Sequence, residues 1–473
     1  MAFQKYMVAA SDYGSPEAQF EVARCYQNGT GVEKNEENAV VWYKKAAEQG
    51  YAEAQKKLGD CYNYGTGVAK DLEQAFECYR KAAEQGNARA QNNLGVCYMK
   101  GSGIAKGPVQ AAEWYARAAE QGLAEAQNNL GLCYMNGNGV TKDPVQAAEW
   151  YARAAEQGLA RAQYNLGYCY KTGEGVEKDP KKAAMWCEKA AEQGIAVAQN
   201  SIGYCYDTGF GVEKDTSKAV FWYRKAAEQG NVGAQYKLGK CYYYGKGTEK
   251  DNEEAVKWFR KAAEQGDADA QYKLGLFYEN GYGVAQNQEE AVKWYRKSAE
   301  QGYADAQYNL AELLLSKDGK EAFKWYQKAA KQGHAGAQDS LGLCYEDMDM
   351  EAGAQNSLSF LYDELELERE IEIDIYSGMG VETDSAKAVE WYRKAAEQGL
   401  GSAQYHLGRC YEGGHGVTKD LTKAAEWYQK AADQGHERAK KALKKLQGCD
   451  VGSAVAAGAA LAATGLIWKI LRG

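Results

Sequence analysis

Apolar and polar residues alternate with a helical period along most of the chain, in short stretches that end at glycine. In residues 88–100, Ala90, Leu94 and Tyr98 recur four residues apart, so they share one face of a helix. Glycine then interrupts the pattern, as at Gly101. This pattern predicts a first helix that ends at a glycine-rich turn.

A second helix is predicted after each glycine turn. Ala111, Trp114 and Tyr115 fall on its apolar face, and Gly122 stands where a left-handed residue ends a helix. The copy that starts at 143–144 begins with Asp-Pro, an N-cap residue followed by proline in the first turn. The unit is therefore a helical hairpin.

The hairpin recurs at a period of 36 residues. Ten tryptophans occupy one position of the second helix, and Cys78 takes that position in one further copy. The tryptophans are Trp42, Trp114, Trp150, Trp186, Trp222, Trp258, Trp294, Trp325, Trp391 and Trp427. The phrase KAAEQG or a close variant ends at Gly50, Gly86, Gly122, Gly158, Gly194, Gly230, Gly266 and Gly302.

No single hairpin of this size can bury its apolar stripe, so stacking on neighbours has to stabilise it. Large Trp and Tyr residues facing small Ala and Gly residues allow close packing between helices. We therefore expect an all-α fold, a right-handed α/α superhelical solenoid of about 12 hairpin repeats.

The repeat resembles the Sel-one-like repeat family, an α/α relative of the tetratricopeptide repeats. The resemblance is carried by the phrase A-x-A-Q-x-x-L-G-x-x-Y-x-x-G-x-G-V, as in residues 124–140, and by A-x-x-W-Y-x-x-A-A-E-Q-G, which ends at Gly158. Both phrases recur over nearly all of residues 1–447. The resemblance implies adaptor or scaffold work in protein complexes, with first helices lining the concave surface.

Breaks in the period divide the chain. We expect an N-terminal half-repeat cap, a regular array, an irregular region with an acidic insertion, C-terminal repeats with a capping helix, and an apolar tail. These segments are residues 1–16, 17–333, 334–383, 384–447 and 448–473. The irregular region has two first-helix phrases, at 337–338 and 354–355, but one tryptophan helix, so we expect that one second helix has been lost.

The acidic insertion, residues 363–374, reads DELELEREIEID. Its alternating apolar and acidic residues suit an exposed strand or an extended helix. One interpretation is a contact surface for a basic partner. The other is a solvated scar of imperfect duplication, which is the usual role of a charge run.

The net charge of −8 and the pI near 5.4 argue against a general nucleic-acid binder, which has a basic surface. Residues 1–14 have neither the basic start nor the apolar core of a secretory signal. We therefore expect a location in the cytoplasm or on the cytoplasmic face of a membrane.

The tail offers two interpretations. Residues 451–468 are uncharged and, as a helix, span about 27 Å, just short of a bilayer core. Their small residues also favour close helix association. The segment is either a marginal membrane anchor or a helix that caps the solenoid or self-associates.

Nine of the twelve cysteines share one first-helix position, and Phe277 and Leu313 fill it in two repeats. Because apolar residues replace it and equivalent sites lie about 10 Å apart, we interpret this cysteine as a packing residue in a reducing compartment. Some secreted members of the resembled family pair two cysteines within a repeat, whereas most repeats here have one.

No catalytic or cofactor constellation stands apart from the repeat, and we expect neither enzymatic activity nor a cofactor. His334, His406, His415 and His436 have no ligand spacing, so surface or helix-end positions are expected rather than a metal site. The G-x-G of the loops follows a helix and lacks the rest of a phosphate-binding motif.

The variable positions of the first helix, opposite its buried stripe, form the candidate partner surface. Asparagine can bond an extended peptide backbone, and tyrosine offers a large contact with a polar tip. The candidate residues are Asn92, Asn93, Asn128, Asn129, Tyr164, Asn165, Tyr168, Tyr204, Tyr236, Lys237, Lys240, Tyr243, Tyr272, Lys273, Tyr308 and Asn309.

The sequence thus favours a scaffold that binds partner proteins or extended peptides on its concave face. The alternatives are a structural spacer without a ligand and an enzyme built on the array. The same face is basic and aromatic from residue 164 to 273, which suits an acidic or aromatic-bearing peptide.

The anchor interpretation of the tail has a direct test. It predicts that the full chain stays with membranes during carbonate extraction, whereas a chain ending at residue 450 is released, because the deletion removes the whole apolar segment. Equal release of both chains, measured by immunoblotting, contradicts the anchor.

Overall fold

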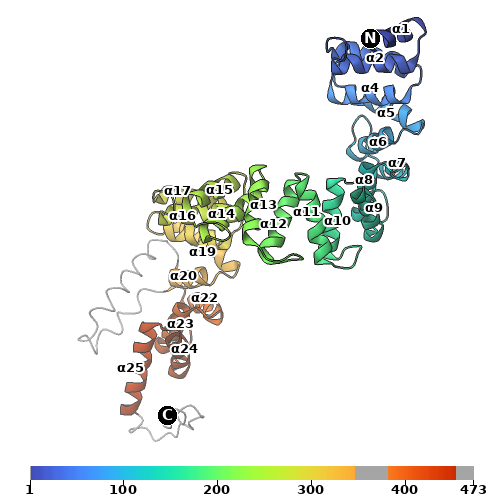
Figure 1. The fold of residues 1–473 in the computed structure, drawn as a ribbon. Coiled ribbons are helices and arrows are strands. Elements are labelled where there is room, and N and C mark those ends of the chain that lie inside the picture. Colours follow the sequence, from blue (N-terminus) through green and yellow to red (C-terminus); the bar gives the residue numbers. More distant parts are fainter. Residues whose placement is uncertain (1, 347–381, 454–473) are drawn as a thin grey trace. The chain divides into compact units, whose positions relative to one another are not determined.

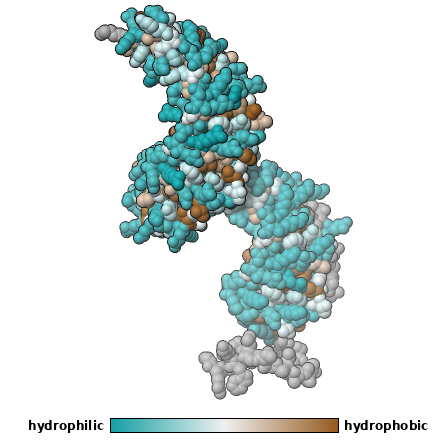
Figure 2. Space-filling model, turned by 90° about the vertical axis from the view of Figure 1, so that its right-hand side faces the viewer, coloured by the Kyte–Doolittle hydropathy of each residue, from teal (hydrophilic) through white to brown (hydrophobic). Residues whose placement is uncertain are grey.

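The computed structural model describes residues 2–346 and 382–453, with side chains to residue 447, and these residues form 24 helices and no strand (Figure 1). Packing divides the chain into two compact units, Met1–Lys250 and Asp251–Gly473. The predicted all-α solenoid of roughly 36-residue repeats is confirmed. The surface seen in Figure 2 is mostly hydrophilic, with apolar residues in small groups.

The helices alternate between two positions in the repeat. The first helices are α2 (Pro16–Asn28), α4 (Ala52–Tyr64), α6 (Ala88–Lys100), α8 (Ala124–Asn136), α10 (Ala160–Thr172), α12 (Ala196–Thr208), α14 (Val232–Tyr244), α16 (Ala268–Asn280), α18 (Ala304–Leu314), α20 (Ala335–Tyr345), α23 (Gly401–Gly413) and α25 (Glu437–Ser453). The second helices are α1 (Ala2–Asp12), α3 (Glu36–Glu48), α5 (Leu72–Glu84), α7 (Pro108–Glu120), α9 (Pro144–Glu156), α11 (Pro180–Glu192), α13 (Thr216–Glu228), α15 (Asn252–Glu264), α17 (Gln288–Glu300), α19 (Gly319–Lys331), α22 (Ser385–Glu397) and α24 (Leu421–Asp433).

The helix ends follow the predicted signals. Asp143 caps α9 by accepting hydrogen bonds from the backbone N–H groups of Val145 and Gln146 at 3.0 and 3.1 Å. Gly101, after α6, and Gly122, after α7, have φ values of 75° and 88°, which side chains with a Cβ rarely adopt. Local sequence therefore sets where each helix begins and ends.

Within a hairpin, a tyrosine of the second helix fits over a glycine of the first. Tyr151 of α9 is buried, and a Cβ added to Gly131 of α8 would lie 2.7 Å from its ring and 3.1 Å from the Ala147 carbonyl oxygen. The same arrangement joins Gly95 to Tyr115. The expected packing of large aromatic residues against small ones takes this form, with the aromatic ring as the nearest neighbour of the glycine.

Tryptophans pack where neighbouring hairpins meet. Trp150 is half-buried and packs against the core that α7 of the preceding hairpin forms with α8 of its own hairpin, which includes Tyr115 and Leu130. Arg153, one turn later, covers the ring at 4.4 Å from its centroid. The sequence placed Trp and Tyr on one buried stripe, but the structure gives them separate partners because adjacent helical positions point about 100° apart.

Buried glutamines connect the helices at the ends of neighbouring repeats. The Gln127 side chain of α8 donates to the Ala119 carbonyl of α7 at 3.2 Å and accepts from Gln157, which follows α9, at 2.8 Å. This arrangement recurs along the chain, for example at Gln55 and Gln91. Each amide thus satisfies a buried carbonyl and ties one hairpin to the previous one.

The second glycine of each loop contacts the preceding repeat. Gly139 has φ 77°, and a Cβ there would lie 2.0 Å from the Pro108 carbonyl oxygen at the start of α7. Gly175 meets Pro144 in the same way, at 1.9 Å. The G-x-G motif therefore serves both as a turn and as a contact between repeats.

The first-helix cysteines are buried in these cores. Cys133 and Cys169 lie in the cores that contain Tyr115 and Tyr151 respectively. Burial raises the pKa of each thiol to about 11, because the low-dielectric core disfavours the thiolate. These positions and pKa values support the packing interpretation.

One hairpin begins in the irregular region and is completed just after it. α20 packs on α22 although nearly 40 residues separate them. A Cβ at Gly342 would meet the Tyr392 ring at 2.4 Å, and Gln398 donates to Gln338 at 2.7 Å, as in a regular repeat. α22 is thus the partner of the phrase at 337–338, and the expected loss of a second helix, which then concerns the phrase at 354–355, stays a prediction.

Several expectations lie outside the described residues. They concern the phrase at 354–355, the acidic segment 363–374 and residues 454–468 of the tail. Among the described helices, none is long and apolar enough to cross a membrane.

Replacing Gly131 with alanine tests the glycine–tyrosine contact. We expect a loss of about 1–3 kcal/mol of unfolding free energy, because the new methyl group overlaps the Tyr151 ring. Urea unfolding followed by circular dichroism measures the change.

Gly233 of α14 provides the matched control. An added Cβ there has its nearest neighbour at 3.5 Å, so Gly233→Ala should leave stability unchanged or raise it by up to about 1 kcal/mol. Equal effects of both substitutions would show that only helix propensity is being measured.

Candidate functional site

The first-helix face is defined here as the side chains at 92, 93, 96 and 99 and their equivalents 36 residues apart. These positions lie between the buried ones on each first helix, and some of their side chains, such as Val96 and Met99, are half-buried against the core. It holds most of the variation between repeats. The predicted partner-binding residues lie on it.

The predicted asparagines bond to one another across repeats. Asn129 donates to Asn92, and Asn165 donates to Asn128, both at 2.9 Å. Asn93 lies 3.4 Å from an Asp60 oxygen. One donor or acceptor of each paired amide therefore joins neighbouring first helices. The remaining half is partly open at Asn92, Asn129 and Asn165 but not at Asn128, which is buried.

Beside these amides runs a column of exposed apolar and aromatic side chains. Leu132, Tyr168 and Tyr204 occupy the same position of α8, α10 and α12 and are 39%, 48% and 37% exposed. Sequence reasoning named both tyrosines but missed Leu132, because it searched the face for polar residues. The 36-residue period is the signal that could have identified Leu132, which stands one period before Tyr168.

The column ends in a group of lysines. The ammonium groups of Lys171 and Lys237 lie 5.1 and 4.5 Å from the Tyr204 ring centroid, and Lys240 lies 5.5 Å from that of Tyr236. Burial lowers the pKa of Lys237, and Lys171 and Lys240 lower it further, whereas Asp207 raises it. Lys171 was missed, although it occupies the position of Met99.

Two buried polar atoms next to Lys237 lack hydrogen bonds within the described part of the chain. They are Asn200 Oδ1 and the Tyr223 hydroxyl. Lys237 occupies the position from which Asn165 donates to Asn128, so Asn200 is left without the corresponding donor. The regular amide pair is thus replaced by an ammonium group held over aromatic rings.

The predicted partner-binding residues of the second unit mainly pack against other side chains of that unit. Tyr272 lies 5.0 Å from Tyr303 and is half-buried, and Tyr308 stacks on His334 at 4.6 Å. Asn309 donates to the Tyr295 hydroxyl at 3.3 Å. These contacts explain why large residues stand there without requiring a ligand.

The remaining predicted residues are placed as follows. Tyr164 is half-buried, the Tyr243 ring lies 4.7 Å from that of Tyr244, and Lys273 lies over Tyr272 at 5.6 Å. These contacts are local and do not add to the column.

One histidine departs from the expected surface or helix-end position. His406 is buried, and its Nδ1 lies 2.9 Å from Asp339, whose other oxygen accepts from Ser402 at 2.6 Å. The pair occupies the positions of Asn129 and Asn92 one repeat apart. Burial disfavours the imidazolium, but Asp339 outweighs burial and raises the pKa of His406 above 6.5.

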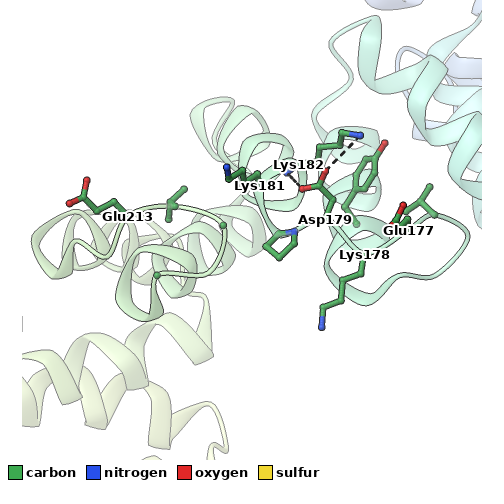
Figure 3. A pocket seen from close by; sticks show the side chains of 12 residues that line it. Glu177, Lys178, Asp179, Lys181, Lys182 and Glu213 are labelled. Carbon is green, nitrogen blue, oxygen red and sulfur yellow. Dashed lines mark hydrogen bonds and ion pairs between the residues drawn. The ribbon is translucent and has the colours of Figure 1, made fainter.

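Metal sites and pockets are weaker candidates than this face. The described residues contain no cluster of metal-ligating side chains. A hollow of about 950 Å³ lies between the loops at 176–182 and 209–213 (Figure 3). Its charges are mixed, and Asp179 already caps α11 by accepting from the Lys182 backbone N–H at 3.0 Å, so the first-helix face is the stronger candidate.

The repeat is the Sel1 repeat, which the chain matches eleven times. The chain belongs to the Sel1 repeat family. The matches span 16–51, 52–87, 88–123, 124–159, 160–195, 196–231, 232–267, 268–303, 304–334, 375–400 and 401–436. The Sel1 match at 375–400 omits its first helix, which the structure identifies as α20.

Solved structures agree with this assignment. A protective antigen present in uropathogenic Escherichia coli strains, displaying an SLR fold, is 36% identical over 94% of this chain and 90% of its own, with a TM-score of 0.79. A Sel1 repeat protein from Oxalobacter formigenes is 33% identical over 66% of this chain and 90% of its own, with a TM-score of 0.52. A search of curated proteins gave no match.

The His406–Asp339 pair predicts a pH dependence of stability. Because the pKa of His406 is raised in the folded chain, its contribution is full below about pH 6.5 and is lost as pH rises through the folded-state value. The unfolding midpoint of the native chain should therefore fall with rising pH relative to a chain carrying D339N and H406N.

This double variant restores the asparagine pair of other Sel1 repeats and leaves the nearby Glu346 and Arg409 in place. Urea midpoints measured between about pH 5.5 and 9 compare the two chains. Parallel curves over this range would contradict the assignment.

Proposed function

We propose that this Sel1 repeat chain is a protein-interaction scaffold that binds an extended polypeptide along the first-helix face of its N-terminal unit. The observation that carries the proposal is the exposed column Leu132, Tyr168 and Tyr204 on three successive repeats. A soluble surface gains nothing from large side chains aligned in this way, whereas a contact surface does.

The spacing of the column suits an extended chain. Helices pack about 8–10 Å apart, and an extended peptide rises about 3.3 Å per residue. Every third residue of a bound peptide would therefore meet one side chain of the column. The open halves of Asn92, Asn129 and Asn165 lie alongside, where they can bond the peptide backbone.

The tyrosines favour binding because they are already held in place. Tyr204 is packed between two lysine side chains, and ordering it on binding costs little conformational entropy. The coarse function agrees with the family, since repeat solenoids commonly bind through extended faces. A spacer role requires no such column.

A photo-crosslinking residue at position 168 or 204 tests the proposal. We expect covalent capture of the same partner from both positions in the native cell, because both side chains face the bound chain. Position 185 provides the control, since Met185 is also exposed but lies on the second helix α11.

The captured partner is then purified and its binding measured. Tyr168→Ala and Tyr204→Ala should each weaken binding by about 1–3 kcal/mol, at least about fivefold in Kd, whereas Met185→Ala leaves it unchanged. Equal crosslinking from all three positions, or equal Kd values, would contradict this site.

A further inference from the structure

We infer that the lysine end of the column, formed by Lys171 and Lys237 over Tyr204 and by Lys240 over Tyr236, recognises a carboxylate of the bound peptide, the side chain of an Asp or Glu residue. This inference rests on the proposed function and specifies its ligand. It makes the preferred ligand a peptide with apolar or aromatic residues followed by an acid.

The charge of this region is unbalanced, although the whole chain is acidic. Across the first-helix face of α8, α10, α12 and α14, Asp207 is the one acidic residue. Within the described residues, none of the three lysines forms an ion pair, whereas Lys182 and Lys218 of the neighbouring second helices pair with Asp179 and Asp215. A peptide carboxylate would supply the missing charge.

The lysines are also held where they can act together. Lys171 and Lys237 both lie over the Tyr204 ring, and Lys237 lies 5.3 Å from the Tyr223 ring. A ring attracts an ammonium group but takes none of its hydrogen-bond donors in the way an oxygen does. The donors of Lys237 therefore stay available while its position is restricted.

The surrounding polar atoms do not satisfy Lys237. Asn200 Oδ1 is buried without a donor, and the Lys237 ammonium group makes no hydrogen bond to it. Because a half-buried ammonium group keeps only part of its hydration, an incoming carboxylate replaces water at lower cost than at an exposed lysine. Asp207 partly offsets the local charge but leaves three lysines facing one acid.

The position of the acid along the peptide follows from the repeat. Tyr168 and Tyr204 stand on adjacent repeats, and Lys237 and Lys240 stand on the next one. At about three extended residues per repeat, the acid should lie about three to six residues from the side chain that contacts Tyr168.

The test selects from a displayed library of random twelve-residue peptides, using the native chain and a variant carrying K171M, K237M and K240M. Methionine keeps the length of the stem and removes the charge. The control variant carries K178M and K181M, two exposed lysines of the same unit, one in a loop and one in the first turn of α11. Thermal unfolding confirms that all three chains fold alike.

We expect the native chain and the control variant to enrich peptides with Asp or Glu beyond an apolar or aromatic residue, and the triple variant to lose the acid. One enriched peptide, capped at both ends, should bind the native chain about tenfold tighter than its Glu→Gln partner. This ratio should shrink at high salt and vanish in the triple variant.

The outcomes separate the two proposals. Enriched peptides without acids, or equal binding of the Glu and Gln peptides, would overturn the carboxylate site but leave the peptide-binding face. Failure to enrich any peptide, together with absent crosslinks from positions 168 and 204, would overturn both.

Discussion

Contact between neighbouring hairpins is the constraint on which the rest of this structure depends. A helix pair of this length has too little apolar surface for a core of its own, so each repeat completes the core of the one before it. Trp150 packs across this boundary, Gln127 bonds across it, and Gly139 leaves room for it. These side chains are therefore not interchangeable with others of similar polarity.

The same contacts explain how one repeat accommodates a long insertion. In the hairpin of α20 and α22, the glutamine pair, the glycine–tyrosine fit and the tyrosine–acid bond between Tyr392 and Glu346 are all present. Their partners are further apart in sequence but meet in the same way. In the sequence, the inserted residues stand between α20 and α22. The contacts of these helices with neighbouring repeats do not depend on the length of that connection.

The first-helix face is under a different constraint. Where its residues do not pack on the core, as Val96 and Met99 do, they have to be compatible with the helix and with the side chain one repeat away. That second condition is met by an asparagine pair at Asn92 and Asn129, by a histidine–aspartate pair at His406 and Asp339, and by a lysine over aromatic rings at Lys237. Variation at the paired positions is therefore restricted to side chains that fit their partner. In the column, Leu132 and Tyr168 stand outside these pairs and can vary to suit a ligand.

The sequence by itself determined the helices, their ends and the repeat, because these follow from local rules. Asp143 and Gly122 mark helix boundaries through backbone geometry, and a strict period makes every copy support the others. The candidate face could be located for the same reason: residues opposite a buried stripe have to point away from the core. Only the tertiary structure decided the partners.

The tertiary structure packed Trp150 on the core shared by α7 and α8 and set Tyr151 over Gly131 of α8. It also paired α20 with α22 across the insertion, buried His406 beside Asp339, and turned the asparagines toward each other. Each of these results depends on which residues of different repeats meet in space. The helical pattern of one segment does not contain that information.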